Sequence, residues 1–263
     1  MFYYYIFLFI IGICLGSFLG TYAWRFKRNI GIGKGRSFCD KCKRKISWFD
    51  NIPLVSYLVL AGKSRCCKAK ITFYYPLVEF LTGVVFAALP YFTNLCFKSS
   101  SCIVNNFGSK SIVFMAFVFV LLILIFLIDL LTLTIPDYLT FLFFGLVLFF
   151  SFFSGAGDIY ARLFAGFVSA TFLLVIVFIT KGKGMGLGDV KLAIPVGYFL
   201  GYPNAFVWLY VSFLVGGLVA IILVVGRMAK LKGRIAFGPF LVIGLLITMV
   251  IGDSLAGYLF AGF

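Results

Sequence analysis

Residues 184–191 read Gly-Met-Gly-Leu-Gly-Asp-Val-Lys and place one carboxylate, Asp189, in a run of glycines between two strongly apolar segments. A charged group beside hydrocarbon is energetically expensive, so an acid in such a place is a candidate for function. The glycines allow the backbone to open and other groups to approach the carboxylate closely. A second acid, Asp129, ends another apolar run sixty positions earlier. We therefore expect a fold in which these two acids meet.

The composition indicates a membrane protein. Of the 263 residues, 63% are hydrophobic and only 12% are charged, and the chain has no histidine. A polytopic protein surrounded by membrane lipid has this composition, and a soluble domain does not. The net charge of +15 does not indicate nucleic acid as a partner, because the basic residues cluster beside apolar runs, as they do in cytoplasmic loops.

Apolar runs predict an all-α polytopic membrane protein with about eight transmembrane helices. The first segment, 1–23, lacks a basic start and a cleavage site, so it is expected to stay as a span. A cytoplasmic loop subdomain, 24–72, then separates the first two helices, and 73–263 forms the remaining membrane core. Gly12, Gly16 and Gly20 recur at a spacing that favours close helix packing. The expected spans are 2–23, 73–92, 111–131, 138–153, 159–180, 190–200, 204–226 and 237–260.

The distribution of basic residues predicts the orientation. With the loop 24–72 on the cytoplasmic side of the membrane, both termini lie outside. Twenty of the 23 Lys and Arg residues then fall inside, and only Lys98, Lys110 and Arg162 fall outside. One outward and one inward crossing separate Asp129 from Asp189, so both acids finish at the cytoplasmic end of the bundle and can meet there.

Two aspartates in one partly desolvated site favour a shared proton, because both cannot ionise cheaply. The charged carboxylate can take a proton from water that attacks a peptide carbonyl. The protonated carboxylate can polarise that carbonyl and later donate to the leaving amine. Because the chain has no histidine, the common serine and cysteine triads are excluded. The pattern indicates an aspartic peptidase.

Each acid also has a structural interpretation. For Asp189, a helix cap with Lys191 nearby is as good an explanation as catalysis. For Asp129 the catalytic interpretation is favoured, because it follows an apolar run without a nearby cation. Asp137 follows Pro136 in an expected first helical turn, where an acid is electrostatically favourable, so it is expected to be structural and is the first rival of Asp129.

Four segments together resemble the prepilin peptidase family, the Gly-x-Gly-Asp aspartic membrane proteases that process type IV pilin precursors. The segments are Gly-Leu-Gly-Asp-Val-Lys at 186–191, Ile-Pro-Asp-Tyr-Leu-Thr at 135–140 after Ile128-Asp129, Ala-Phe-Gly-Pro-Phe at 236–240, and Gly-Ser-Phe-Leu at 16–19 with Arg25. The third segment has Ala236 where the family has proline.

The resemblance implies catalytic residues, substrates and a cofactor. The catalytic residues would be Asp129 and Asp189, with Gly186, Gly188, Lys191 and Asp137 in the supporting motifs. The substrates would be type IV prepilins or pseudopilins, cut after a short basic leader on the cytoplasmic side. Family members with an inserted loop like 24–72 also methylate the new N-terminus with S-adenosylmethionine, so a second, methyltransferase activity is expected.

The loop contains Cys39-x-x-Cys42 and, downstream, Cys66 and Cys67. Two thiolate pairs can close a tetrahedral zinc site, and the cytoplasm assigned to this loop favours metal over disulfides. However, the family pattern would place the third cysteine at position 64, which is Ser64 here. Zinc and ordinary free thiols are therefore both retained as interpretations. In the loop assigned to the outside, Cys96 and Cys102 could form a disulfide.

Other functions remain as alternatives. A proton- or cation-coupled transporter could use the same two acids as an ion site. A protease that cuts within the bilayer shares the Gly-x-Gly-Asp motif, but its Pro-Ala-Leu element is absent here. A non-catalytic scaffold is disfavoured by two membrane acids. Glu79, near the end of the second span, is explained equally well as a helix-end anchor and as part of the methylating site.

Overall fold

Every regular element in the described part of the chain is a helix. The computed structural model describes residues 2–31, 37–39, 41–98, 110–154, 158–182, 184–226 and 235–260, and within them it shows only two isolated β-bridges outside the helices. The chain divides into two compact units, Met1–Leu89 and Pro90–Phe263. The expected all-α fold is confirmed.

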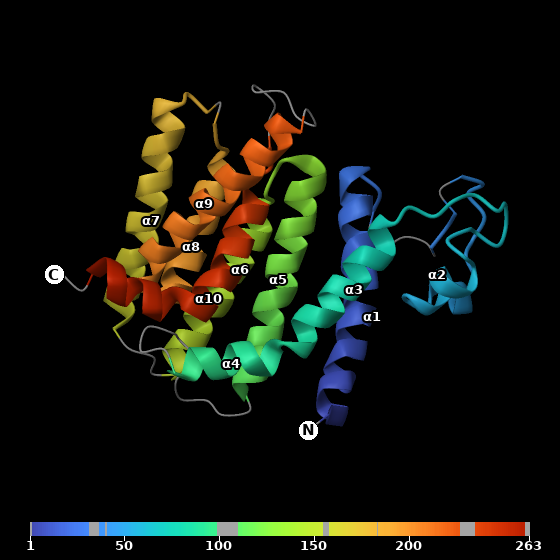
Figure 1. The fold of residues 1–263 in the computed structure, drawn as a ribbon, viewed down its shortest axis with the longest axis horizontal. Coiled ribbons are helices and arrows are strands. Elements are labelled where there is room, and N and C mark those ends of the chain that lie inside the picture. The colour runs from blue at the N-terminus through green and yellow to red at the C-terminus, as the bar shows by residue number, and fades with distance from the viewer. Residues whose placement is uncertain are drawn as a thin grey trace. The chain divides into compact units, whose positions relative to one another are not determined.

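The first unit pairs two long helices and carries the loop between them. Helix α1 (Phe2–Lys27) packs along α3 (Tyr74–Ala87), and the connecting loop contains the short helices η1 (Trp48–Asn51) and α2 (Val55–Val59) (Figure 1). A methyl group on Gly12 would lie 2.8 Å from Gly83 Cα, and one on Gly16 would lie 3.0 Å from Glu79 Cα. The glycine spacing in α1 therefore marks a close helix contact, as expected.

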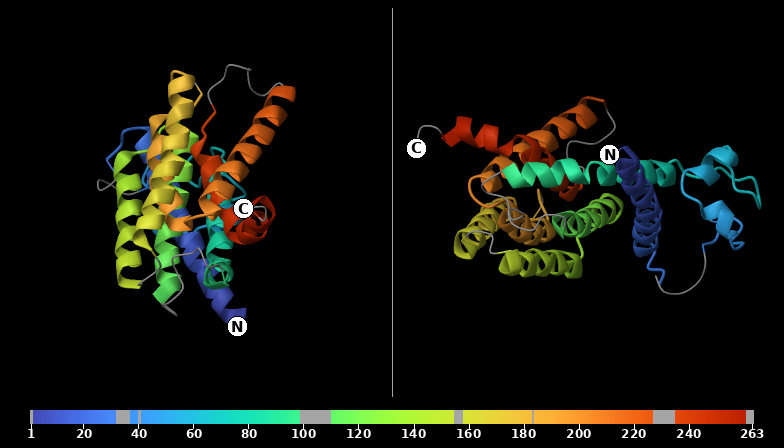
Figure 2. Two further views of the ribbon diagram at one scale, coloured as in Figure 1. Left: turned by 90° about the vertical axis from the view of Figure 1, so that its left-hand side faces the viewer. Right: turned by 90° about the horizontal axis from the view of Figure 1, so that it is seen from below.

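The second unit is a helical bundle built around α8. Its elements are α4 (Leu89–Lys98), α5 (Lys110–Thr132), α6 (Asp137–Ser154), α7 (Ile159–Ile179), α8 (Leu187–Leu200), α9 (Asn204–Val225) and α10 (Gly238–Phe260). Helix α8 contacts α6, α7, α9 and α10, and it lies among them in the ribbon views (Figures 1 and 2). Because ten of its residues are buried, α8 is a central helix of the bundle.

Glycine also brings α7 and α8 together. A methyl group on Gly197 of α8 would lie 2.9 Å from Gly166 Cα of α7, so the two backbones meet where both residues lack a side chain. On the neighbouring pair, the Trp208 indole of α9 donates to the Leu241 carbonyl of α10 over 2.8 Å. These contacts fix the helices whose first turns carry the candidate site.

The expected number of eight spans is not confirmed. Among the described residues, six helices are long and apolar enough to cross a membrane, namely α1, α5, α6, α7, α9 and α10, and the number rises to seven if α3 and α4 together form one span. Helix α8 has fourteen residues, and at ~1.5 Å per residue it is about 21 Å long, shorter than the ~30 Å hydrocarbon layer. The apolar run of α8 therefore reflects burial among other helices at least as much as contact with lipid.

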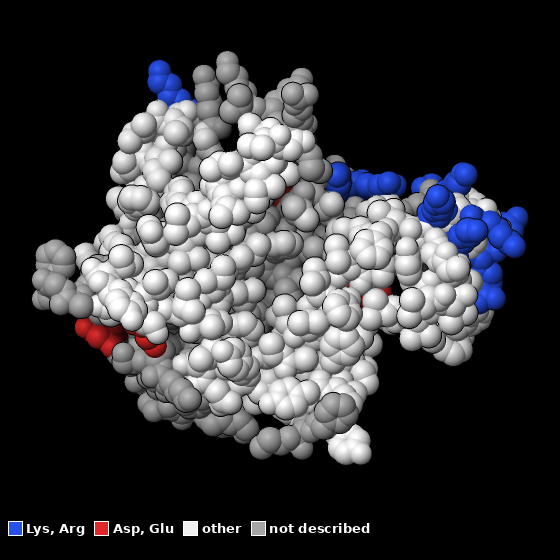
Figure 3. Space-filling view, in the orientation of Figure 1, with Lys and Arg blue, Asp and Glu red and all other residues white. Residues whose placement is uncertain are grey.

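Basic side chains gather over the loop of the first unit (Figure 3). Because so many exposed charges are incompatible with hydrocarbon, this segment lies in water. The exposed ones between the end of α1 and the start of α3 are Lys27, Arg28, Lys41, Lys43, Arg44, Lys45, Lys63, Arg65, Lys68 and Lys70.

Candidate functional site

Asp129 lies in the last turn of α5 and is held by the start of α10. Its side chain is buried, with 4% of its surface exposed. The carboxylate oxygen Oδ2 accepts a hydrogen bond of 2.9 Å from the Gly238 backbone N–H. Gly238 is the first residue of α10, where unpaired N–H groups and the helix dipole favour a negative charge. The pairing gives a buried acid a fixed position without neutralising it by a cation.

Asp189 occupies the first turn of α8 and is equally enclosed, with 6% of its surface exposed. Its Oδ2 accepts a hydrogen bond of 3.2 Å from the Gly186 N–H, which is the contact of a capping acid. Asp189 therefore does cap the start of α8. This does not exclude chemistry, because an ionised carboxylate has about four acceptor positions and the cap occupies one.

The two acids approach each other beside the side chain of Ile135. Asp129 is close enough for its negative charge to act on Asp189. The Ile135 side chain lies between the glycines that neighbour them, since methyl groups on Gly188 and Gly238 would each lie 3.1 Å from it. The segment between α5 and α6 thus packs against the first turns of both α8 and α10. This arrangement places two buried carboxylates, each with one glycine N–H donor, in one small region.

Asp137 and Lys191 pair with each other. The Lys191 ammonium lies 2.7 and 2.8 Å from the two Asp137 carboxylate oxygens, and both side chains are largely exposed. Asp137 is also the first residue of α6, as expected for a structural acid in a first helical turn. Lys191 therefore pairs with Asp137, although Asp189 is nearer in sequence, and this ion pair joins α6 to α8.

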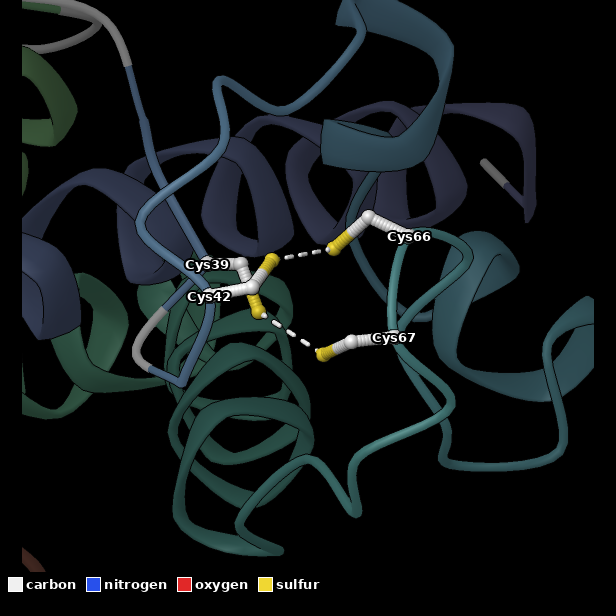
Figure 4. Close-up of side chains that lie close together, drawn as sticks. All are labelled: Cys39, Cys42, Cys66 and Cys67. Carbon is white, nitrogen blue, oxygen red and sulfur yellow. Dashed lines mark hydrogen bonds between the residues drawn. The ribbon is translucent and has the colours of Figure 1, made fainter.

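The four loop cysteines form one cluster (Figure 4). All four sulfur atoms lie within 4.8 Å of one another, with Cys39 Sγ 3.7 Å from Cys67 Sγ and Cys42 Sγ 3.0 Å from Cys66 Sγ. Adjacent Cys66 and Cys67 both point toward the first pair. In tetrahedral zinc sites with Zn–S bonds of ~2.3 Å, the sulfurs are about 3.8 Å apart. The cluster therefore fits a four-thiolate metal ion after small adjustments.

The thiols in the cluster differ in acidity. The pKa of Cys39 is lowered to about 6, chiefly because the Cys42 backbone N–H donates to its sulfur. The pKa of Cys66 is raised to about 12, chiefly because its thiol hydrogen-bonds Cys42. Ser64, at the position where the family pattern has a cysteine, lies 3.2 Å from the Cys67 sulfur through its hydroxyl. Hydrogen bonds thus hold the sulfur atoms together.

Of the two cysteines expected to form a disulfide in the second unit, only Cys96 lies among the described residues. Cys96 is disulfide-bonded, which agrees with the expected oxidation of that loop. Cys102, the partner expected from the sequence, lies outside the described residues.

Glu79 lies on α3, facing α1 and the loop. It is buried, with 8% of its surface exposed, and its Oε2 accepts a hydrogen bond of 2.8 Å from the Leu54 N–H. The Ser17 side chain of α1 also hydrogen-bonds the carboxylate. Leu54 has a φ of +58°, a conformation unfavourable for leucine, so the contact holds a strained turn in place. Glu79 therefore anchors the loop to α3. Its carboxylate has further acceptor positions that a ligand can use.

Several site residues escape sequence reasoning. Gly238 was recognised only as part of a resembling segment, yet its N–H holds Asp129 from 109 positions away. Ile135 was likewise recognised only as part of a resembling segment, and Leu54 was not singled out. A glycine followed by proline at the start of an apolar run is a sequence sign of a helix start that could have identified Gly238.

Comparisons with known proteins agree with these observations. Residues 10–102 match the family model described as Bacterial Peptidase A24 N-terminal domain, and residues 116–221 match the Type IV leader peptidase family. The chain is 32% identical to a prepilin leader peptidase/N-methyltransferase of Bacillus subtilis, over 95% of this chain and 96% of the relative. Proteins of the same name from Neisseria gonorrhoeae and Aeromonas hydrophila are 30% and 33% identical, over 93% and 87% of this chain and 90% and 76% of their own lengths. No solved structure matches significantly.

Proposed function

The chain belongs to the type IV leader peptidase family, and we propose that it removes the basic leader from type IV prepilins or pseudopilins and methylates the new N-terminus. The observation that carries the peptidase proposal is the pair of buried acids, Asp129 and Asp189, on two different helices. Each is held by a glycine N–H, and the two lie within electrostatic reach of each other.

The two carboxylates act as one unit. Repulsion between them favours a state in which one is charged and the other holds a proton. The charged carboxylate takes a proton from a water molecule, whose oxygen attacks the scissile carbonyl carbon. The protonated carboxylate hydrogen-bonds the carbonyl oxygen and then gives its proton to the leaving nitrogen as the C–N bond breaks. The glycine donors keep the two groups in position for this exchange.

The loop of the first unit is assigned to methylation and to the cytoplasmic side. This orientation rests on the exposed basic side chains of the loop, which favour the cytoplasmic face. When bound, S-adenosylmethionine supplies a methyl group that moves from its sulfonium sulfur to the new N-terminal nitrogen, which loses a proton. The first unit supplies the groups that bind and orient the two reactants. With α3 and α4 together as one span, this orientation places the N-terminus outside and cleavage at the inner surface, and the C-terminus also faces outward if α8 crosses, as the eight expected spans require.

Product masses test the function. The full chain, purified in detergent, is incubated with a pilin precursor, with and without S-adenosylmethionine. Without the donor, the product is expected to have lost the leader. With the donor, the product is expected to have lost the leader and gained the mass of one methyl group. An intact precursor under both conditions would refute the peptidase proposal, and a shortened but unmethylated product would refute the methyltransferase proposal.

We also propose that the cysteine cluster binds one zinc ion that shapes the loop. Replacing Cys39 and Cys42 together by serine is expected to abolish zinc binding, because two of four ligands are lost. Methylation is expected to fall much further than leader removal, since the acid pair lies in the other unit. Zinc is measured by elemental mass spectrometry, with about one ion per chain expected in the unaltered protein.

Cys14→Ser is the matched control, because Cys14 is an exposed free thiol on α1 outside the cluster. It is expected to keep both zinc and methylation. Zinc content near zero in the unaltered protein would refute the metal site. Equal loss of cleavage and methylation in the double variant would refute a separate role for the loop.

The ion pair between Asp137 and Lys191 predicts a small effect. Asp137→Asn is expected to retain leader removal within about threefold and to lower the free energy of unfolding by about 1 kcal/mol or less, because exposed ion pairs contribute little. Initial cleavage rates and thermal unfolding measure both quantities. A loss of cleavage by several orders of magnitude would instead make Asp137 the partner of Asp189.

A further inference from the structure

The first unit contains a cavity that the peptidase chemistry does not use. Its volume is ≈ 370 Å³, within the roughly 300–1,000 Å³ typical of small-molecule sites. The described residues around it come from α1, the loop and α3, all within Met1–Leu89. Cys39 and Cys66 of the cysteine cluster line one part of it, so the same loop segments build the cluster and the cavity wall.

Seven charged side chains among the described residues line this cavity, and two of them, of opposite charge, are buried. Arg25 of α1 and Glu79 of α3 each have 8% of their surface exposed. Glu79 is hydrogen-bonded by Leu54 and Ser17, and its carboxylate has further acceptor positions. The guanidinium of Arg25 carries five N–H donors in a planar fork that matches a carboxylate.

Aromatic side chains supply the apolar part of the wall. Trp24, Phe38 and Tyr57 line the cavity together with Tyr75. Planar rings can stack on a purine base, and their faces attract a cation such as a sulfonium group. The Trp24 ring carries the Arg28 guanidinium at 4.0 Å, so this ring accepts a cation on one face.

We propose that this cavity binds S-adenosylmethionine, with Arg25 holding the carboxylate of its amino-acid part and Glu79 its ammonium group or ribose hydroxyls. The ligand is zwitterionic at one end, cationic at the sulfur and aromatic at the other end, which matches the three kinds of group on the wall. This inference rests on the proposed methyltransferase function and assigns that function a place in the chain. Arg25 and Glu79 are binding residues in this assignment.

Binding of the demethylated product, S-adenosylhomocysteine, tests the assignment without any turnover. Titration calorimetry on the detergent-purified full chain is expected to give saturable binding, weakened about tenfold or more by Glu79→Gln and by Arg25→Met, because each removes a charge-assisted contact. Lys27→Met is the matched control, since Lys27 is an exposed cation two positions from Arg25 and outside the cavity lining. Its affinity is expected to be unchanged. Thermal unfolding without ligand identifies any variant that fails to fold.

A second measurement needs no variant. Ultraviolet cross-linking of labelled S-adenosylmethionine to the unaltered chain, followed by peptide mass spectrometry, is expected to label peptides within 17–79. Label confined to the unit that begins at Pro90 would overturn the assignment, as would unchanged affinity in both folded variants. If the unaltered chain binds neither compound, the methyltransferase proposal itself fails, whereas binding that ignores Arg25 and Glu79 refutes only the cavity.

Discussion

Asp129→Asn and Asp189→Asn are each expected to lower the rate of leader removal by about 10³-fold or more, and the double variant is expected to be no slower than either single one. Catalytic groups that act as a unit show this non-additivity. The asparagine side chain keeps an oxygen that can accept from Gly238 or Gly186, so both variants are expected to stay folded. Single-turnover cleavage of a pilin precursor measures the rate.

Asp137→Asn is the matched control for these variants, because it removes one carboxylate charge from the same part of the second unit without touching a buried group. Thermal unfolding establishes that each variant is folded. If either single variant kept more than a tenth of the original rate, the two acids could not both be essential to the chemistry.

Gly238→Ala is expected to reduce leader removal by about 100-fold through a purely steric effect. The added methyl group would lie 2.6 Å from Asp129 Oδ2 and 3.1 Å from the Ile135 side chain. Because Asp129 is buried and is held by the same residue's N–H, its carboxylate has to move. A displacement of about 1 Å in a catalytic group can cost this much rate. Methylation of an already processed pilin is expected to continue, since it is assigned to the other unit.

Gly257→Ala provides the matched control on the same helix. No other group lies within 4 Å of a methyl group added at Gly257, so α10 receives the same substitution without a collision. Normal cleavage is expected, with a gain in helix stability of up to ~1 kcal/mol. Equal rates for the two alanine variants would show that the Gly238 contact does not position Asp129.

The sequence predicted the helices and the general place of the acids because both depend on local patterns. Apolar runs of about twenty residues identify spanning helices directly, and Asp137 after Pro136 identifies the start of α6. The parity of the crossings between Asp129 and Asp189 needs only the two helices between them. The approach of the two acids therefore does not depend on how many helices cross the membrane.

What the sequence did not predict depends on contacts between distant segments. Nothing in an apolar run tells whether it faces lipid or other helices, so α8 was expected to span although it has only fourteen residues and lies inside the bundle. The partner of Lys191 could not be chosen from spacing alone, since Asp189 is near in sequence and Asp137 only in space. Likewise, adjacent Cys66 and Cys67 can both face one centre only because the loop turns there.

We propose that two buried aspartates cut the precursor while the first unit transfers the methyl group. The most direct test of this proposal gives the double variant Asp129→Asn/Asp189→Asn a mixture of pilin precursor, already processed pilin and S-adenosylmethionine, and weighs the products. We expect an intact precursor and a processed pilin heavier by one methyl group. A precursor shortened by the double variant would show that the two aspartates do not carry out the cleavage.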